Sequence, residues 1–90
     1  MYECDFIIKK GLEITQVIQV AVTLTDPKTR ERELAGLAEA IRCYHPEHAI
    51  ILTLDESETC ELHIENKRHL VSVIPVWKWM LSHSLQTSAH

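Results

Sequence analysis

The 90-residue sequence lacks several features that mark particular classes of protein. It holds two glycines, too few for the glycine-rich loop of the G-x-x-x-x-G-K type that cradles phosphates. No apolar run approaches the roughly 20 residues that a membrane helix needs, and no charged-then-apolar signal peptide opens the chain. Signatures of a catalytic serine or cysteine are also absent. If a longer protein containing this chain hydrolyses ATP, that activity lies outside these residues.

An excess of basic charge is lacking as well. The net charge is −4, which argues against a free-standing, non-specific DNA-binding protein, because such proteins are normally basic. The cysteines are few, and their spacing shows no pairing motif. Cys4, Cys43 and Cys60 are odd in number and form no C-x-x-C motif, which indicates reduced thiols in a cytoplasmic protein.

What is present favours one small soluble domain. The chain is 46% hydrophobic and 24% charged, as globular domains are. Patterned elements extend over residues 1–81, whereas residues 82–90 are polar and without period. We therefore expect a folded domain at 1–81 and a flexible tail at 82–90.

The first 22 residues predict a hairpin. A three-residue loop at 10–12, containing a glycine, would place Glu3 opposite Gln19 and Asp5 opposite Val17. In this register the hairpin has one apolar face and one mostly polar face, and any chemistry is expected on the polar face. The apolar set is Tyr2, Cys4, Phe6, Ile8, Leu12, Ile14, Ile18, Val20 and Val22, interrupted by Gln16. The polar set is Glu3, Asp5, Ile7, Lys9, Glu13, Thr15, Val17, Gln19 and Ala21.

The rest of the chain predicts a crossover helix followed by further strands. Asp26 and Pro27 form a strong helix start, and His45-Pro46 marks the end of a helix that runs to about Cys43. Strands are expected at 49–54, 60–65 and 69–74, with a short helix at 76–81. The first strand after the helix should pair in parallel with the hairpin through a right-handed crossover. The fold class is therefore α/β, a small mixed sheet with one main helix. The helix has an apolar stripe of Leu34, Leu37, Ala38 and Ile41, and we expect Arg30, Glu31, Glu39 and Arg42 to face water or a partner.

Three segments carry a resemblance to a known family. Residues 3–6 (E-C-D-F), 12–20 and 74–81 (I-P-V-W-K-W-M-L) resemble the C-terminal segment of prokaryotic AAA-type ATPases that carry a DUF4143 region. The terminal part of that region is similar to the PD-(D/E)XK nuclease fold, also called restriction-endonuclease-like. The resemblance covers nearly all of the chain up to Leu81. It implies that this is one domain of a larger ATP-binding protein.

The resemblance also implies a position for a site. Enzymes of this fold hold Mg²⁺ with two or more carboxylates and use a lysine to stabilise charge. In the family pattern an aspartate lies on the first hairpin strand and an acid-x-Lys triplet on the second. Asp5 matches the aspartate, while Gln19 stands in place of the second acid and Ala21 in place of the lysine. Glu3 would lie beside Gln19 and compensate in part, with Lys9 or Lys10 as a displaced cation.

Three functions follow as hypotheses. The first is a non-catalytic domain that contacts the rest of the ATPase, a second copy or DNA. The second is a metal-dependent DNA nuclease that uses Glu3, Asp5 and the carbonyl of Gln19, with Mg²⁺ as its cofactor. The third is a purely structural dimerisation module. The degenerate triplet favours the first.

Other patterns point to less specific roles. The spacing of Cys43, His45 and His48, with Cys60 and His63 further on, is not that of a recognised zinc site, so the histidines are interpreted as exposed polar residues. The acidic residues Asp55, Glu56 and Glu58 are interpreted as a turn that keeps a strand end soluble.

Two tryptophans lie close together near the end of the domain. Trp77 and Trp79 cannot face the same side of a helix. Either one closes the core while the other lies on the surface or at an inter-domain or dimer interface, or both close the core through a bend at Pro75.

Overall fold

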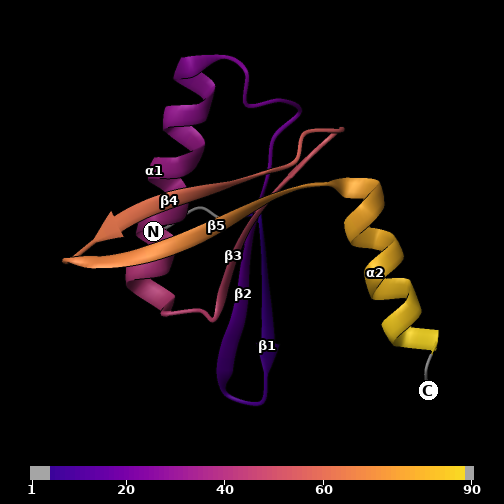
Figure 1. The fold of residues 1–90 in the computed structure, drawn as a ribbon. Coiled ribbons are helices and arrows are strands. Elements are labelled where there is room, and N and C mark those ends of the chain that lie inside the picture. Colours follow the sequence, from indigo (N-terminus) through magenta and orange to yellow (C-terminus); the bar gives the residue numbers. More distant parts are fainter. Residues whose placement is uncertain (1–4, 89–90) are drawn as a thin grey trace.

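A computed structural model describes the backbone of residues 5–88 and the side chains of residues 5–82. It shows a five-stranded mixed sheet with one helix against each face (Figure 1). The elements in chain order are β1 (Phe6–Lys10), β2 (Glu13–Val20), α1 (Pro27–Tyr44), β3 (His48–Thr53), β4 (Glu58–Ile64), β5 (Lys67–Pro75) and α2 (Val76–Ser88).

The strands lie in the order β1-β2-β3-β5-β4. Strand β1 pairs antiparallel with β2, and β4 pairs antiparallel with β5. Between these two hairpins, β3 pairs in parallel with both β2 and β5. The predicted α/β class is confirmed, with its N-terminal hairpin, crossover helix, parallel central strand and second hairpin.

Helix α1 begins and ends where its sequence predicts. The carboxylate of Asp26 accepts a hydrogen bond from the backbone N–H of Thr29 at 3.0 Å, and Pro27 occupies the first turn, where no N–H is needed. At the other end, His45 adopts a left-handed conformation with φ 49° and donates its N–H to the carbonyl of Ile41 at 2.9 Å. Pro46 then prevents the helix from continuing.

The sheet has a buried core on each side. On the face that α1 covers, the α1 face, Leu37 and Ile41 pack against the central strands in a cluster that includes Val17 and Ile51. On the opposite face, the α2 face, a smaller cluster of Ile18, Ile50 and Leu52 packs against Trp79 and other partly buried residues. Both faces are apolar because β2 and β3 carry apolar residues at consecutive positions.

Helix α1 packs on the mostly polar face of the hairpin, and the apolar face is the more exposed one. The mostly polar set lies on the α1 face, where Val17, Gln19 and Ala21 are all buried. Phe6, Ile8, Ile18 and Val20 of the apolar set lie on the α2 face, with Phe6 58% and Val20 47% exposed, whereas Ile14, beyond the bulge, packs on the α1 face. The expectation that the polar face carries accessible chemistry is therefore wrong at β2. Helix α1 lies between the parallel strands β2 and β3 in the chain, and the right-handed sense of such crossovers decides which face of the sheet the helix covers.

Helix α2 starts directly after Pro75, as predicted, and continues beyond Leu81 to Ser88. The expected tail at 82–90 is thus helical in the part that the structure describes. No helix within residues 5–88 combines the length and the apolar character that crossing a membrane requires.

Candidate functional site

The geometry of the N-terminal hairpin depends on one extra residue in β2. At the turn, Lys10 pairs with Glu13 across a two-residue loop, and this pairing corrects the predicted three-residue loop. The register then shifts, so that Ile8 pairs with Gln16 and Thr15 is left as the extra residue of a β-bulge. The hydroxyl of Thr15 donates a hydrogen bond to the carbonyl of Ile8 at 3.1 Å, which ties the bulge to β1.

The bulge changes which residues face each other at the open end of the hairpin. Phe6 pairs with Ile18, so the same register carried one residue further places Asp5 beside Gln19, and not opposite Val17 as predicted. The carboxylate of Asp5 accepts a hydrogen bond from the backbone N–H of Val20 at 2.7 Å. Glu3, the other acid assigned to this site, lies outside the described residues.

Gln19 is turned toward helix α1. Its side chain is 7% exposed, and its amide nitrogen donates to the carboxylate of Glu33 at 3.2 Å. The amide oxygen of Gln19 is buried and has no hydrogen-bond partner in the described part of the chain. The glutamine thus joins the sheet to the helix, and sequence reasoning missed Glu33 because it lies 14 residues further along the chain.

The position expected to hold a lysine is apolar. Ala21 is 8% exposed and belongs to the core under α1, while its backbone N–H donates to the carbonyl of Leu52 at 2.9 Å. A cavity of about 110 Å³ adjoins it at the carboxyl ends of β2 and β3. The cavity is lined by Val20, Ala21, Val22, Leu52, Thr53, Leu54 and Val76. Such a lining offers no charge to a phosphate or to a metal-bound water.

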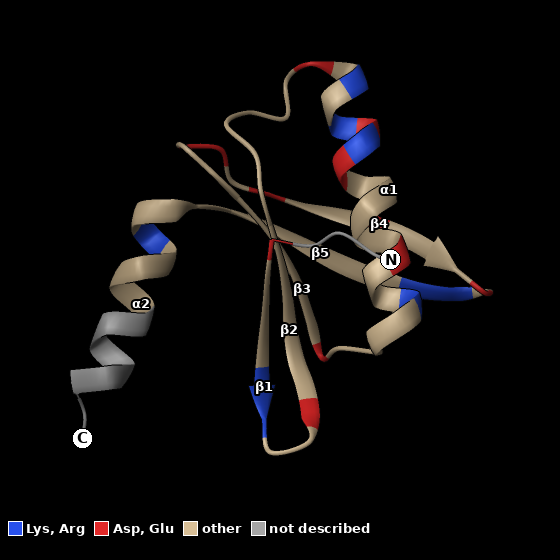
Figure 2. Ribbon diagram, turned by 180° about the vertical axis from the view of Figure 1, so that it is seen from behind, with Lys and Arg blue, Asp and Glu red and all other residues tan. Residues whose placement is uncertain are grey.

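The two candidate replacement lysines are far from this position. Lys9 pairs with Ile14 and Lys10 with Glu13, at the turn of the hairpin. Five residues of β2 separate Ile14 from Gln19, a distance of roughly 16 Å along a strand. Figure 2 shows the blue segment of β1 at the turn end of the hairpin, away from the carboxyl end of β2. Neither lysine belongs to the site.

Magnesium does not fit the residues present. Mg²⁺ requires near-octahedral oxygen coordination with carboxylates among its ligands. The described part of this position offers two carboxylates, and both are engaged: Asp5 accepts the N–H of Val20, and Glu33 accepts the amide of Gln19. No group of three or more histidine, cysteine, aspartate or glutamate side chains suitable for a metal ion occurs among the described residues, at this position or around Cys43, His45 and His48.

The hydrogen bonds of Glu56, here called the Glu56 latch, join the loops at the carboxyl ends of β2 and β3, and sequence reasoning did not find them. Glu56, expected to serve only solubility, accepts hydrogen bonds from the hydroxyl of Thr23 and from the backbone N–H of Leu24, the latter at 2.9 Å. Its own N–H and carbonyl bond to the hydroxyl of Thr53, each at 2.9 Å. Glu56 thereby fixes the loop that leads from β2 into α1.

A second polar cluster joins α1 to β4. Arg30, expected to face water or a partner, donates two hydrogen bonds to the carboxylate of Glu58, at 2.6 and 3.0 Å. The same guanidinium contacts the sulfur of Cys60 at 3.0 Å, and this thiol lies 3.2 Å from Glu58. The hydrogen bond from Arg30 lowers the pKa of Glu58 to about 2 and raises that of Arg30 itself. Burial raises the pKa of Cys60, so the thiol is unreactive at neutral pH.

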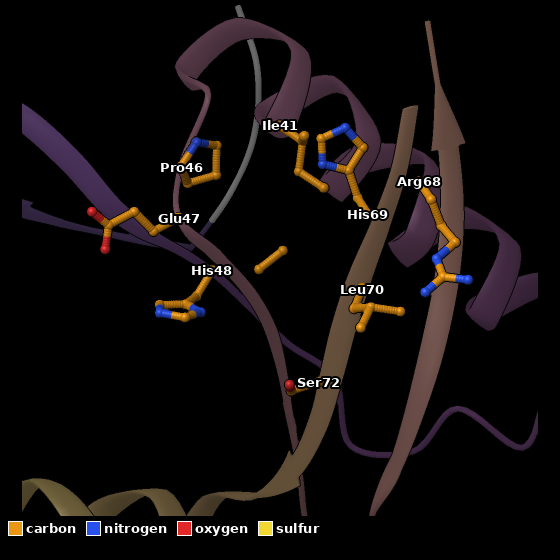
Figure 3. A pocket seen from close by; sticks show the side chains of 9 residues that line it. Ile41, Pro46, Glu47, His48, Arg68, His69, Leu70 and Ser72 are labelled. Carbon is orange, nitrogen blue, oxygen red and sulfur yellow. The ribbon is translucent and has the colours of Figure 1, made fainter. Parts of the chain in front are cut away.

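A larger hollow of about 450 Å³ lies at the amino ends of β3 and β5. Figure 3 shows His48 and Glu47 on one side of it, and Arg68 and His69 on the other. The residues that line the hollow include one acid, Glu47, and one base, Arg68. Arg68 also lies 3.9 Å from Glu61 on β4. This mixture favours neither an anion nor a cation.

The two tryptophans have different environments. Trp79 is half-buried and packs against the cluster of the α2 face, whereas Trp77 is 56% exposed. One therefore closes the core and the other lies on the surface, the first of the two arrangements expected from their spacing. Met80 and Leu81, next along α2, are 57% and 58% exposed, so the open side of this helix is largely apolar.

Comparison with known proteins finds a relative that is itself uncharacterised. The chain is 30% identical, over 84 residues, to an uncharacterised protein of Methanocaldococcus jannaschii, "Uncharacterized protein MJ1544". The alignment covers 91% of this chain and 18% of the relative, so the chain spans less than a fifth of the relative's length. No family model and no solved structure matches the chain.

Proposed function

We propose that this chain is a non-catalytic contact domain of a larger cytoplasmic ATPase, with a restriction-endonuclease-like fold whose catalytic residues have been replaced. The observation that carries the proposal is the state of the acid-x-Lys positions. Gln19 is buried and bonded to Glu33, and Ala21 is buried beside an apolar cavity. The resemblance to the ATPase family and the greater length of the archaeal relative support the place in a larger protein.

The contact is made with protein rather than with DNA. The net charge of −4 opposes binding to a polyanion. In Figure 2 the acidic and basic residues alternate along α1 and form no basic stripe. The open side of α2, with Trp77, Met80 and Leu81 exposed, instead presents apolar surface of the kind that protein interfaces bury. In the larger protein this side would face the remaining domains.

The absence of catalysis is tested by calorimetric titration with Mn²⁺, using Asp5→Ala as the control. We expect no saturable binding to either protein, and no cleavage of plasmid DNA with Mg²⁺ or Mn²⁺. Saturable binding that disappears in Asp5→Ala, together with cleavage, would replace the proposal by the metal-dependent nuclease. Fluorescence anisotropy with labelled duplex DNA tests the choice of partner, and tight binding at physiological salt would contradict it.

Membership of a larger ATPase is tested on the full-length archaeal relative. We expect the purified relative to release phosphate from ATP. We also expect its version of this domain to resist proteolysis better in the intact protein than when expressed alone, because the other domains cover the open side of α2. Absence of ATP hydrolysis would remove the ATPase from the proposal. Equal protease sensitivity would remove the inter-domain contact.

A further inference from the structure

Strand β1 is an edge strand whose exposed lysines, Lys9 and Lys10, lie at its turn end and leave its apolar start without a charged residue. Its described neighbour in the sheet is β2, and its other side is open (Figure 1). Phe6 is 58% exposed on the α2 face and Ile7 is 38% exposed on the α1 face. Natural edge strands are usually guarded by charged residues, because an open row of backbone N–H and C=O groups recruits another strand. The opposite edge, β4, has such guards in the exposed Glu58, Glu61 and His63.

The open edge of β1 is regular enough to accept a strand. The extra residue of the bulge, Thr15, lies in β2, so β1 itself remains an unbroken strand. The carbonyl of Ile8 points to β2, where it accepts the hydroxyl of Thr15. Because backbone groups alternate in direction along a strand, those of Ile7 and Lys9 point to the open side.

The charges of β1 are complementary to those of β1 itself in antiparallel orientation. An acid, Asp5, directly precedes the strand, residues 6–8 are apolar, and the strand ends with two bases, Lys9 and Lys10. Figure 2 shows the red and blue segments at opposite ends of this strand. If Ile7 lies opposite Ile7 of a second copy, each Asp5 faces the second copy's Lys9, and each Phe6 faces the second copy's Ile8. The apolar residues at 6–8 then meet one another, and the charges of Asp5 and Lys9 meet their opposites.

We propose that two copies of this chain associate through antiparallel pairing of their β1 strands, with Ile7 on the two-fold axis, to form one continuous ten-stranded sheet. The sheet order places β1 at the rim, so the pairing moves no element of the fold. The second oxygen of the Asp5 carboxylate stays available to Lys9 while the first holds the N–H of Val20. The arrangement does not depend on the identity of the larger protein, nor on metal binding.

Sedimentation velocity over a range of concentrations tests the proposal. The wild-type chain is expected to sediment as a dimer. Ile7→Lys places two like charges on the axis and is expected to raise the dissociation constant of the dimer at least about tenfold. Leu12→Lys is the matched control, because Leu12 lies in the hairpin turn and is 101% exposed. This variant is expected to dimerise as the wild type does.

A charge reversal makes the test independent of folding defects at Ile7. Lys9→Asp sets like charges opposite each other at both ends of the pairing and is expected to weaken the dimer. The double variant Asp5→Lys with Lys9→Asp restores opposite charges and is expected to recover dimerisation. A monomer at all concentrations would overturn the proposal. So would a dimer that survives Ile7→Lys and is lost in Trp77→Ala, or failure of the double variant to recover while circular dichroism shows it folded.

Discussion

The guanidinium of Arg30 on α1 donates hydrogen bonds to both carboxylate oxygens of Glu58 on β4, at 2.6 and 3.0 Å. The two residues are 28 positions apart in the chain. Fork-to-fork geometry of this kind is the strongest form of ion pair between side chains. Both side chains are more than a third exposed, so solvent screens the attraction. The pair ties the first turns of α1 to β4, while Glu33, one turn further along the helix, bonds to Gln19 of β2.

Replacing Glu58 should therefore make the free energy of unfolding less sensitive to a fall in pH. Glu58→Gln is expected to lower the free energy of unfolding at pH 7 by about 0.5–1 kcal/mol. The pKa of Glu58 is about 2 in the folded protein, below the ordinary value of 4.5. The unfolded chain thus takes up the proton first, and the contribution of the pair, complete above pH 4.5, is lost as the pH falls toward 2.

Urea denaturation at pH 7, 4 and 2.5 measures this difference. The gap in unfolding free energy between wild type and Glu58→Gln should shrink as the pH falls. Glu31→Gln, an exposed position on the same helix, serves as the control and should show no such gap. A gap that stays constant with pH would mean that Glu58 acts through packing rather than through its charge.

The Glu56 latch predicts an unequal effect of two neighbouring acids. Glu56→Ala leaves the backbone N–H of Leu24 without its acceptor, and Leu24 is only 2% exposed. An unpaired buried donor costs about 1–3 kcal/mol, so we expect the free energy of unfolding to fall by that amount and the midpoint of thermal unfolding to fall with it. Asp55→Ala, in the same turn and exposed, should stay within about 0.5 kcal/mol of the wild type. Equal losses in a calorimetric scan would contradict the latch.

Restoring an acid at Gln19 should destabilise the fold. Gln19→Glu would set a second carboxylate beside Glu33 in place of an amide that lies 3.2 Å from it. Repulsion between like charges at this partly buried position is expected to lower stability by about 1–2 kcal/mol at pH 7, and by less near pH 4, where carboxylates take up protons.

The matched variant is Gln19→Glu combined with Glu33→Gln, which exchanges the two groups and should recover most of the lost stability. Chemical denaturation of the four proteins gives the coupling between the two positions. Additive effects would show that Gln19 and Glu33 do not interact.

The two tryptophans should differ in what they contribute. Trp79→Ala removes a large side chain from the cluster of the α2 face and is expected to cost about 2–4 kcal/mol, whereas Trp77→Ala should cost less than about 1 kcal/mol. Acrylamide quenching of each single-tryptophan variant checks the difference in exposure. Equal quenching of the two would contradict the arrangement described for α2.

Much of the fold follows from local patterns in the sequence. Asp26 and Pro27 announce the start of α1 and Pro46 its end, because capping and proline geometry act over a few residues. The parallel pairing of β2 with β3 follows from the length of the connection between them. The α/β class therefore needed no long-range information.

The face of the hairpin that lies under α1 did not follow. Ile18 and Val17 are adjacent in β2 and both are fully buried, so the strand has no single apolar face to indicate where the helix packs. The bulge at Thr15 was equally hidden, because neither glycine nor an unusual residue marks it. Together with the shorter turn, each contributing one position, it displaces the partner of Asp5 from Val17 to Gln19.

The contacts around the candidate site were also out of reach of sequence reasoning. Gln19 meets Glu33 and Arg30 meets Glu58 only after the crossover has brought the helix over the sheet. The resemblance drew attention to Gln19 and Ala21, and the assignment of these two positions to a former catalytic pair stays a prediction.

Strand β3 lies between two hairpins that are each local in the chain. Hairpins of adjacent strands form within microseconds, because closing a short loop loses little entropy. Strand β3 has no such local partner, since both of its neighbours are reached through longer connections, one of them α1 and the other β4. We therefore expect the pairing of β3 with β2 and β5 to be the late step in folding. The same two pairings should be the first to open.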